Sequence, residues 1–313
     1  MVPILMQTLP FFGLIALGYG SGRTGFFNEA ATAALTRFVF YFALSAMLFR
    51  FAATLTLAEL IDWQLIWAYL CGTMAVYLLA TGVAILRRRP VAEAALEAQI
   101  AVIGNVGFLG IPMLALLLGP EAVGPVLQVL AVDLIVFGSL IVILITGSRD
   151  GRVSVRVLGT VGLGLLKNPM IVSISLGLLV SALGWTVPGP VDGFLSLLGA
   201  AATPGALFAI GASLASKSAE RLAVAAWLSA AKLVLHPLAV AGAILFLFDV
   251  DPYSAGVVIA AAALPVAGNV YILAQHYGVA PQRASAAILI STALSVLTVT
   301  YVIARVTGTG GPA

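Results

Sequence analysis

Charged residues are scarce in this chain of 313 residues. They make up 9% of the sequence, against 62% hydrophobic residues and a mean hydropathy of +1.14. A soluble globular domain carries roughly 25% charged residues, so this composition excludes that class and predicts an integral membrane protein whose surroundings are the lipid bilayer. The formal net charge of +3 is not gathered into a basic stripe with interleaved aromatic residues. No nucleic-acid partner is therefore expected.

Cysteine and histidine are also scarce. The single cysteine, Cys71, excludes a disulfide within the chain and a thiolate metal site, and its apolar surroundings predict a packed side chain. The sequence has no His-Glu-x-x-His, no Cys-x-x-Cys and no pair of intramembrane aspartates, which metallo- and aspartyl intramembrane proteases require. We expect no metal, no cofactor and no enzymatic activity. The alternative of another class is an intramembrane serine hydrolase with Ser213 as nucleophile and His236 as base.

Long apolar runs are abundant. Because a helix rises about 1.5 Å per residue and the hydrocarbon core is about 30 Å thick, one crossing needs roughly 20 apolar residues. Ten spans are expected, at about 4–22, 34–54, 63–86, 95–118, 123–147, 169–186, 191–215, 222–248, 253–277 and 283–305. The sixth opens at Pro169, a good first-turn residue, directly after Asn168.

The basic residues support this count, since Lys and Arg accumulate in cytoplasmic loops. Ten helices place the following residues on one side: Arg23, Arg37, Arg87, Arg88, Arg89, Arg149, Arg152, Arg156, Lys167, Lys217, Arg221 and Arg283. Only Arg50 and Arg305 fall on the other side, which also carries the acidic residues Glu59, Asp62, Glu121, Asp192, Asp249 and Asp251. We expect a multi-pass protein of the cell (inner) membrane with both termini on the extracytoplasmic side.

Two of the spans are interrupted by polar and helix-breaking residues. The fourth contains Gly104-Asn105-Val106 and continues to Pro112, and the ninth contains Pro265 followed by Gly268-Asn269-Val270. Unwound backbone is tolerated at membrane depth only where it is buried in protein or lines a cavity, and such breaks mark the substrate site of secondary transporters. The pattern therefore predicts a carrier.

The two breaks occupy the same ordinal place in two halves of five helices. An odd number of helices in each half inserts the second half upside down relative to the first. We therefore expect an all-α membrane fold with a first repeat at 1–147, a cytoplasmic connecting loop at 148–168 that lies along the membrane interface, and an inverted second repeat at 169–313.

Amide and glycine residues at the breaks are the first candidates for substrate contacts. Asn105 and Asn269, with Gly104 and Gly268, lie where half-helix N-termini would present N–H groups to an anion. Pro112 and Pro265 are the candidate break residues. The alternative is that each Asn only caps its own kinked helix.

Three titratable residues in the middle of apolar spans are candidates for a function inside the membrane. Asp133 lies near the middle of the fifth span, where an isolated carboxylate is costly and suits a proton-binding role or a structural partnership with Lys232; Gln128 could share either role. Lys232 and His236 lie four residues apart and point the same way, so they could attract an anion or balance Asp133. A packed, hydrogen-bonded His236 is the alternative.

These motifs resemble those of the auxin efflux carrier family, whose bacterial members are often labelled malonate or malate permeases. The resemblance covers nearly the whole chain and is carried by Gly104 to Pro112, Lys167-Asn168-Pro169, Thr203 to Leu214 and Pro265 to Asn269. It implies a crossover of the broken helices 4 and 9, of the bile-acid-transporter and NhaA type. It also implies a scaffold domain of helices 1, 2, 6 and 7, and an elevator-like transport domain of helices 3–5 and 8–10. In plant relatives the substrate carboxylate meets the fourth-helix Asn, which matches Asn105.

The expected function is secondary transport of small organic anions, such as malonate, malate or auxin-like acids. Proton coupling through Asp133 is expected, because that carboxylate stands where the plant carriers use neutral polar side chains; a sodium-coupled carrier of the bile-acid type is the alternative. Glycine-rich faces of the scaffold helices, with Gly13, Gly18 and Gly177, permit a homodimer.

Overall fold

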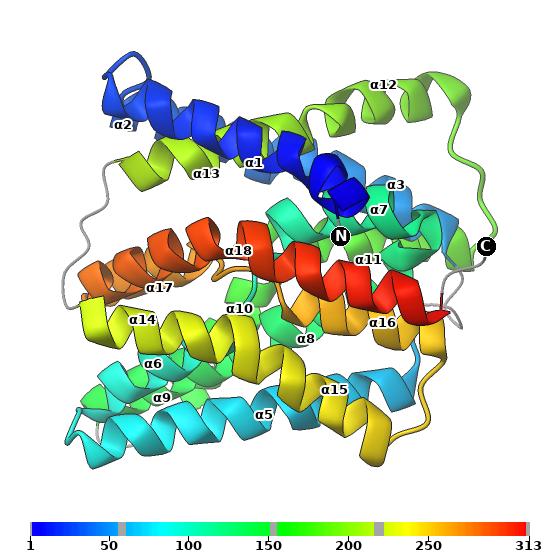
Figure 1. Ribbon diagram of the computed structural model, residues 1–313. Helices are drawn as coiled ribbons and strands as arrows, with labels where there is room; N and C mark the ends of the chain where they lie inside the picture. Colours follow the sequence, from blue (N-terminus) through cyan, green and yellow to red (C-terminus); the bar gives the residue numbers. More distant parts are fainter. Residues whose placement is uncertain (1, 56–60, 151–154, 216–221, 311–313) are drawn as a thin grey trace.

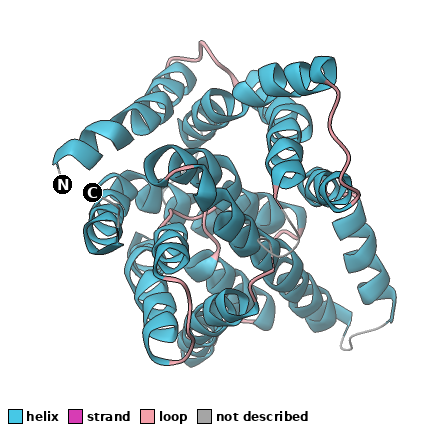
Figure 2. Ribbon diagram, turned by 90° about the vertical axis from the view of Figure 1, so that its right-hand side faces the viewer, coloured by secondary structure: helices cyan, strands magenta, loops and turns pink. Residues whose placement is uncertain are grey.

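The computed structural model describes residues 2–55, 61–150, 155–215 and 222–310. Four charged residues of the expected membrane topology lie outside these ranges: Glu59, Arg152, Lys217 and Arg221. Within them, the ordered elements are all helical, and Figure 2 shows many of the helices nearly end-on.

The first half of the chain contains these helices: α1 (Val2–Arg23), α2 (Glu29–Phe38), α3 (Leu44–Thr54), α5 (Trp63–Leu86), α6 (Val91–Val102), α7 (Ile111–Leu118), α8 (Val123–Val132) and α9 (Gly138–Asp150). The second half contains these: α10 (Val155–Leu166), α11 (Pro169–Ala182), α12 (Gly189–Ala200), α13 (Ala202–Ala215), α14 (Leu222–Ala230), α15 (His236–Phe246), α16 (Pro252–Ala262), α17 (Gly268–His276) and α18 (Pro281–Gly310).

Short helical segments of other types join some of these helices. The π-helical segments are η1 (Val39–Ala43), η2 (Val106–Gly110), η4 (Asp133–Phe137) and η5 (Ala231–Leu235), and η3 (Pro120–Ala122) is a 3₁₀ turn. Isolated π-helical turns are frequent at functional sites. Asp133 and Lys232 both lie in such turns.

Each of the ten ranges expected from the sequence is mostly helical, and the fourth and ninth contain unwound residues between two helices. By length and composition, six stretches of the described residues can cross a membrane: Glu29–Thr54, Trp63–Leu86, Pro120–Arg149, Gly189–Ala215, Leu222–Phe246 and Pro281–Val306. Three apolar helices are shorter: Val106–Leu118, Pro169–Ala182 and Pro252–Ala262. The protein is a multi-pass membrane protein, and the count of ten crossings stays a prediction.

Local sequence explains where several helices begin. The Asn168 side chain accepts the N–H of Met170 at 3.0 Å, and Pro169 occupies the first helical position, where its missing N–H costs nothing. This confirms the start of α11 predicted from Asn168-Pro169. Asp62 and Asp251 cap α5 and α16 in the same way.

The helices pack in two groups. In one, α1 packs along α13, and α3 packs along α11 and α12; in the other, α5 packs against α6 and α15, and α18 against α14 and α16. Figure 1 shows α1, α12 and α13 together above, and α5, α6, α9, α14 and α15 together below, with α17 and α18 between them.

Glycines make the close approaches of the first group possible. A Cβ on Gly18 would lie 2.1 Å from the carbonyl oxygen of Phe208, and a Cβ on Gly177 would lie 2.5 Å from that of Phe49. Gly18 and Gly177 therefore pack α1 on α13 and α11 on α3 within one chain. These two glycines are therefore not free to form a dimer face, and of the three named for it only Gly13 has open space around it. The homodimer itself stays a prediction.

Two further expectations need correction. Cys71 is exposed on α5, so the side chain predicted to be packed lies on the outer surface of the helix. The segment at 148–168 is mostly helical, since α9 extends to Asp150 and α10 covers Val155–Leu166. A helix there is compatible with the amphipathic interfacial segment that the sequence predicts.

An ionic network joins α5, α6 and α18 at one end of the second group. Glu97 is fully buried and pairs with both Arg87 and Arg283, the latter at 2.6 Å. Arg283 also pairs with Glu93 at 3.0 Å, and Arg89 approaches Glu93 at 4.0 Å. The network ties helices from both halves of the chain into one unit.

Candidate substrate site at the helix crossover

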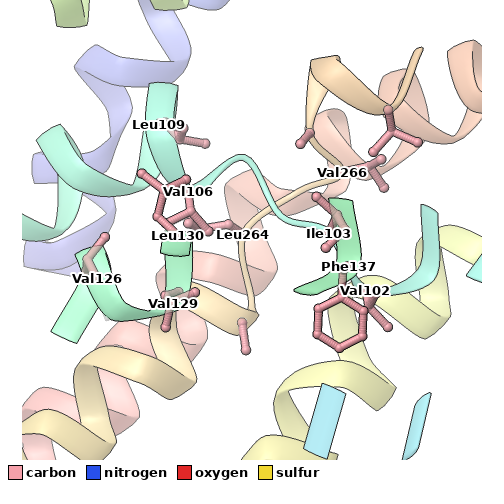
Figure 3. Close-up of a cluster of buried hydrophobic side chains, with 14 of the residues drawn as sticks. Val102, Ile103, Val106, Leu109, Val126, Val129, Leu130, Phe137, Leu264 and Val266 are labelled. Carbon is pink, nitrogen blue, oxygen red and sulfur yellow. The ribbon is translucent and has the colours of Figure 1, made fainter. Parts of the chain in front are cut away.

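Two unwound segments cross where α6 and α16 end. Gly104 and Val266 face each other as an antiparallel pair: the N–H of Asn105 donates to the carbonyl of Pro265 at 2.8 Å, and that of Ala267 donates to the carbonyl of Ile103 at 3.0 Å. Figure 3 shows this region, with Val106, Leu130 and Leu264 on one side of the crossing and Ile103 and Val266 on the other. The two breaks predicted from the sequence therefore meet.

The residue types at the crossing explain why the helices stop there. A Cβ on Gly104 would lie 3.3 Å from both Cε and Nζ of Lys232, so glycine permits the strand to approach the lysine. Pro265 has no N–H to satisfy, and the N–H of Val266 donates to Ser291 Oγ at 3.1 Å. The unwound backbone thus finds partners inside the protein, as membrane depth requires.

Two helix N-termini begin at the crossing. Asn105 precedes the helical stretch η2–α7, and Gly268 begins α17, with Asn269 in its first turn. N–H groups at such termini carry partial positive charge and favour an anion. Asn105 is 6% exposed and no described residue is hydrogen-bonded to its amide, whereas Asn269 is exposed. Both amides are available to a ligand.

The C-terminal end of α16 also lies at the crossing, and Lys232 of η5 bonds to it. Lys232 is the only lysine among the buried side chains of the described residues. Lys232 Nζ donates to the carbonyl of Ala262, the last residue of α16, at 2.5 Å, and lies 3.1 Å from His236 Nδ1. His236 Nδ1 also lies 3.2 Å from the Ala262 carbonyl, so it accepts from Lys232 in one tautomer and donates to that carbonyl in the other. Nε2 lies 3.0 Å from Thr73 Oγ1 and can donate to it.

Asp133 lies in the same buried region. Its Oδ1 accepts the hydroxyl of Tyr69 at 2.8 Å, and its Oδ2 has no hydrogen-bond partner among the described residues. The Tyr69 ring packs edge-on against the His236 ring at 5.8 Å. The charge of Lys232 acts on Asp133, but the described residues contain no ion pair between the two within 4.0 Å. Tyr69 and Thr73 lie one turn apart on α5. Through their hydrogen bonds to Asp133 and His236, they connect the Asp133 carboxylate to the pair of Lys232 and His236.

A crossover of broken helices within a multi-pass bundle is the architecture of a transporter, and the comparison with known proteins agrees. The family described as "Membrane transport protein" matches residues 3–303 of the chain. The protein belongs to this family, the auxin efflux carriers.

Curated relatives support the same assignment. The "Putative malonate transporter" of Rhizobium meliloti (strain 1021) is 33% identical over 306 residues, which covers 96% of this chain and 95% of the relative. The "Uncharacterized transporter YfdV" of Escherichia coli (strain K12) is 28% identical over 291 residues, covering 90% and 91%. The "Lysosomal cholesterol signaling protein" of Mus musculus is 26% identical over 247 residues, or 74% of this chain and 28% of that protein.

Other predicted site residues of this transporter lie in different places. Gln128 Oε1 accepts the N–H of Asp62 at 3.1 Å, so Gln128 holds the start of α5. Pro112 is in the first turn of α7, beyond the unwound residues, so the crossing itself contains only Pro265. Gly268 is exposed, with open space where a Cβ would lie.

Three polar residues of the carrier were not predicted. Tyr69, Thr73 and Ser291 are buried and hydrogen-bond to Asp133, His236 and the Val266 backbone respectively. The spacing of Tyr69 and Thr73 repeats that of Lys232 and His236, so each pair lies on one face of its own helix. This spacing does not indicate that the two faces meet.

Proposed function

We propose that the protein is a secondary active carrier of small organic anions, in particular carboxylates, that works by elevator-type alternating access coupled to protons. The observation that carries this proposal is the antiparallel crossing of Gly104 and Val266. Two helices begin next to this crossing, and each has an Asn amide at its start, Asn105 and Asn269. Such a site can bind an anion without a charged side chain, because its hydrogen-bond donors are backbone N–H groups that the helix holds in place.

The chemistry of the crossing favours a carboxylate. Asn105 donates from its amide while adding no charge, and the ammonium of Lys232 lies directly beneath Gly104. A second carboxylate of a dicarboxylate would feel that positive charge. The name of the Rhizobium meliloti relative, which mentions malonate, supports the same substrate class.

Asp133 is the proposed proton site. One carboxylate oxygen accepts from Tyr69, and the other is buried without a partner in the described structure. A buried charge with an unsatisfied oxygen is costly, and a proton on Oδ2 lowers that cost because it removes the charge. Protonation and substrate binding would be linked through Lys232, whose charge acts on both positions.

Sodium coupling is less well supported. In carriers of this architecture, free carbonyls at half-helix C-termini coordinate the cation. Here the carbonyl of Ala262, at the C-terminus of α16, already accepts from the Lys232 ammonium at 2.5 Å. The Lys232 ammonium therefore already occupies a carbonyl that a sodium ion would need there.

The unequal surroundings of the two half-helices support alternating access. The η2–α7 half packs against the first helix group: the Phe40 and Phe108 rings stack at 6.2 Å, and a Cβ on Gly107 would lie 2.6 Å from Met170 Cε. By contrast, α17 exposes Asn269, Ile272 and Gln275 along one face. We infer a conformation open towards the end of α17, which the basic-residue pattern places in the cytoplasm. The first group, of α1 to α3 and α11 to α13, would be the scaffold.

The hydrolase alternative fits the geometry poorly. His236 would have to accept a proton from Ser213, but its Nδ1 lies beside Lys232 and the Ala262 carbonyl, and its Nε2 lies beside Thr73. Both ring nitrogens are therefore engaged within the crossover cluster.

The test is transport by purified protein in liposomes, with malonate, malate and indole-3-acetate under imposed pH and sodium gradients. Saturable carboxylate transport that is driven by a pH gradient supports the proposal. Transport driven by sodium alone would replace proton coupling with the bile-acid-type alternative. Absence of carboxylate transport under all gradients would overturn the substrate class.

A further inference from the structure

A cavity of about 270 Å³ lies apart from the crossing, between the two helix groups. Its lining includes Arg50 and Thr54 of α3, Asp192 of α12, and Pro120 and Val123 from the start of the helical stretch that carries Asp133. It therefore borders both the proposed scaffold and the proposed transport domain. The basic-residue pattern places this end of the bundle on the extracytoplasmic side.

Arg50 brings spare hydrogen-bond donors to this cavity. Its Nε and Nη2 donate to the two carboxylate oxygens of Asp192 at 2.7 and 3.2 Å, and its Nη1 donates to Ser196 Oγ at 3.1 Å. A guanidinium has five N–H groups, so two are left without an acceptor among the described residues. The Arg50 and Asp192 side chains are 37% and 46% exposed, so solutes can reach them.

A guanidinium binds a carboxylate with two parallel hydrogen bonds, which is the arrangement that Asp192 already shows. We propose that this cavity is an extracytoplasmic docking site for the carboxylate of the transported anion, in which Arg50 binds the substrate in competition with Asp192. The proposal rests on the proposed function. Asp192 keeps the site weak, because the substrate replaces one carboxylate by another, and a weak site releases its anion quickly.

The position of the cavity makes such a site useful. The crossing residues are not part of its lining, so docking does not compete with binding at the crossing. An anion held at Arg50 would wait at the boundary along which the transport domain moves. The extracytoplasmic KM would then depend on Arg50, and the cytoplasmic KM would not.

The experiment compares carboxylate uptake in right-side-out and inside-out membrane vesicles. Arg50→Gln should raise the extracytoplasmic KM for malonate by roughly tenfold, the effect of losing one charge-assisted pair, and leave the cytoplasmic KM unchanged. Asp192→Asn should lower the extracytoplasmic KM several-fold, because the competitor is gone. Arg305→Gln removes the same charge from the same side, away from the cavity, and should change neither value.

Equal effects of Arg50→Gln on both sides, or KM shifts of the same sign for Arg50→Gln and Asp192→Asn, would show a purely structural role and overturn the proposal. An equal effect of Arg305→Gln would assign the result to surface charge. A lipid phosphate is the other anion that a guanidinium at this depth could bind. An extracytoplasmic KM that rises when phosphatidylglycerol is added to phosphatidylcholine vesicles would assign the site to lipid instead.

A second readout does not depend on transport. Malonate should slow hydrogen exchange of the purified protein around Arg50–Thr54 and Asp192–Ser196, in the wild type and in Asn105→Ala but not in Arg50→Gln. Protection there without any carboxylate transport would reject the proposed function and keep the docking site. Transport without this protection would do the reverse.

Discussion

The ammonium of Lys232 donates to the carbonyl of Ala262 at the point where α16 stops at the crossing. Lys232→Met roughly keeps the length of the side chain and removes the ammonium, which contacts both that carbonyl and His236 Nδ1. We expect a loss of roughly 1–3 kcal/mol of unfolding free energy, the cost of losing a hydrogen bond from a buried charged donor, and at least a tenfold loss of transport. The melting temperature of the purified protein and uptake in liposomes measure the two effects. Lys167→Met, a matched change in the connection before α11, should melt like the wild type; if Lys232→Met does so too, the cap is not stabilising.

Asp133→Asn tests the coupling site with little change of shape. The amide oxygen can still accept from Tyr69, but the side chain can no longer release a proton. We expect the variant to bind malonate and to lose its response to an imposed pH gradient in liposomes. Glu121→Gln is the control, since Glu121 is an exposed carboxylate at the start of the same helical stretch. Accumulation that still follows the pH gradient in Asp133→Asn would remove Asp133 as the proton site.

Ser291 holds the second strand of the crossing through the N–H of Val266. Ser291→Ala leaves this buried N–H unsatisfied, so we expect a loss of roughly 1–3 kcal/mol of unfolding free energy together with a higher KM for the carboxylate. Ser295→Ala is the matched control, because Ser295 is equally buried one turn further along α18 and its hydroxyl donates to Thr292 in the same helix. If the two variants have the same KM, Ser291 has no part in shaping the site.

The positions of the two helix breaks could be predicted from the sequence because their causes are local. Gly104, Pro265 and the two Asn residues break helices through their own conformational preferences, and the spacing of Lys232 and His236 places them on one face. The start of α11 followed from Asn168 and Pro169 in the same way.

The partners across helices could not be predicted. Which face of α5 meets Asp133 and His236 depends on how separate helices rotate against one another, and an apolar run of residues contains no signal for that rotation. The same holds for Gly18 and Gly177, whose close approaches look alike in sequence whether the neighbouring helix belongs to the same chain or to a second copy. The π-helical turns at Asp133 and Lys232 could not be predicted either, because the pattern of apolar residues does not change there.

The buried Glu97, at the end of the second helix group, gives a further stability prediction. Arg283→Gln removes one of its two cationic partners, and breaking a buried pair costs roughly 3–5 kcal/mol. Arg89→Gln, whose pair with Glu93 is half-exposed and long, should cost roughly 0–1 kcal/mol. Melting temperatures of the two variants give the comparison. The double variant Glu97→Gln with Arg283→Gln should be less destabilised than the sum of the single changes, and strict additivity would show that the two side chains do not interact.

The exposure of Asn269 predicts from which side the crossing can be reached. In a Cys71→Ser background, which removes the exposed native thiol, Asn269→Cys should react with a membrane-impermeant thiol reagent applied from the cytoplasmic side. Bound malonate should slow the reaction, because the substrate would cover the start of α17. Labelling in right-side-out and inside-out vesicles, followed by mass spectrometry, measures both effects.

Val270→Cys is the control for this labelling, since Val270 is the next residue and fully buried. It should stay unreacted from either side. The opposite half-helix is covered by Phe40 and Met170, so access from the extracytoplasmic side requires the transport domain to move away from α11 and η1. If Asn269→Cys reacts only from the extracytoplasmic side, either the inferred orientation of the chain or the inferred open side is wrong. Labelling Glu29→Cys, in the first turn of α2 on the expected cytoplasmic side, separates these two cases, because that position reports the orientation alone.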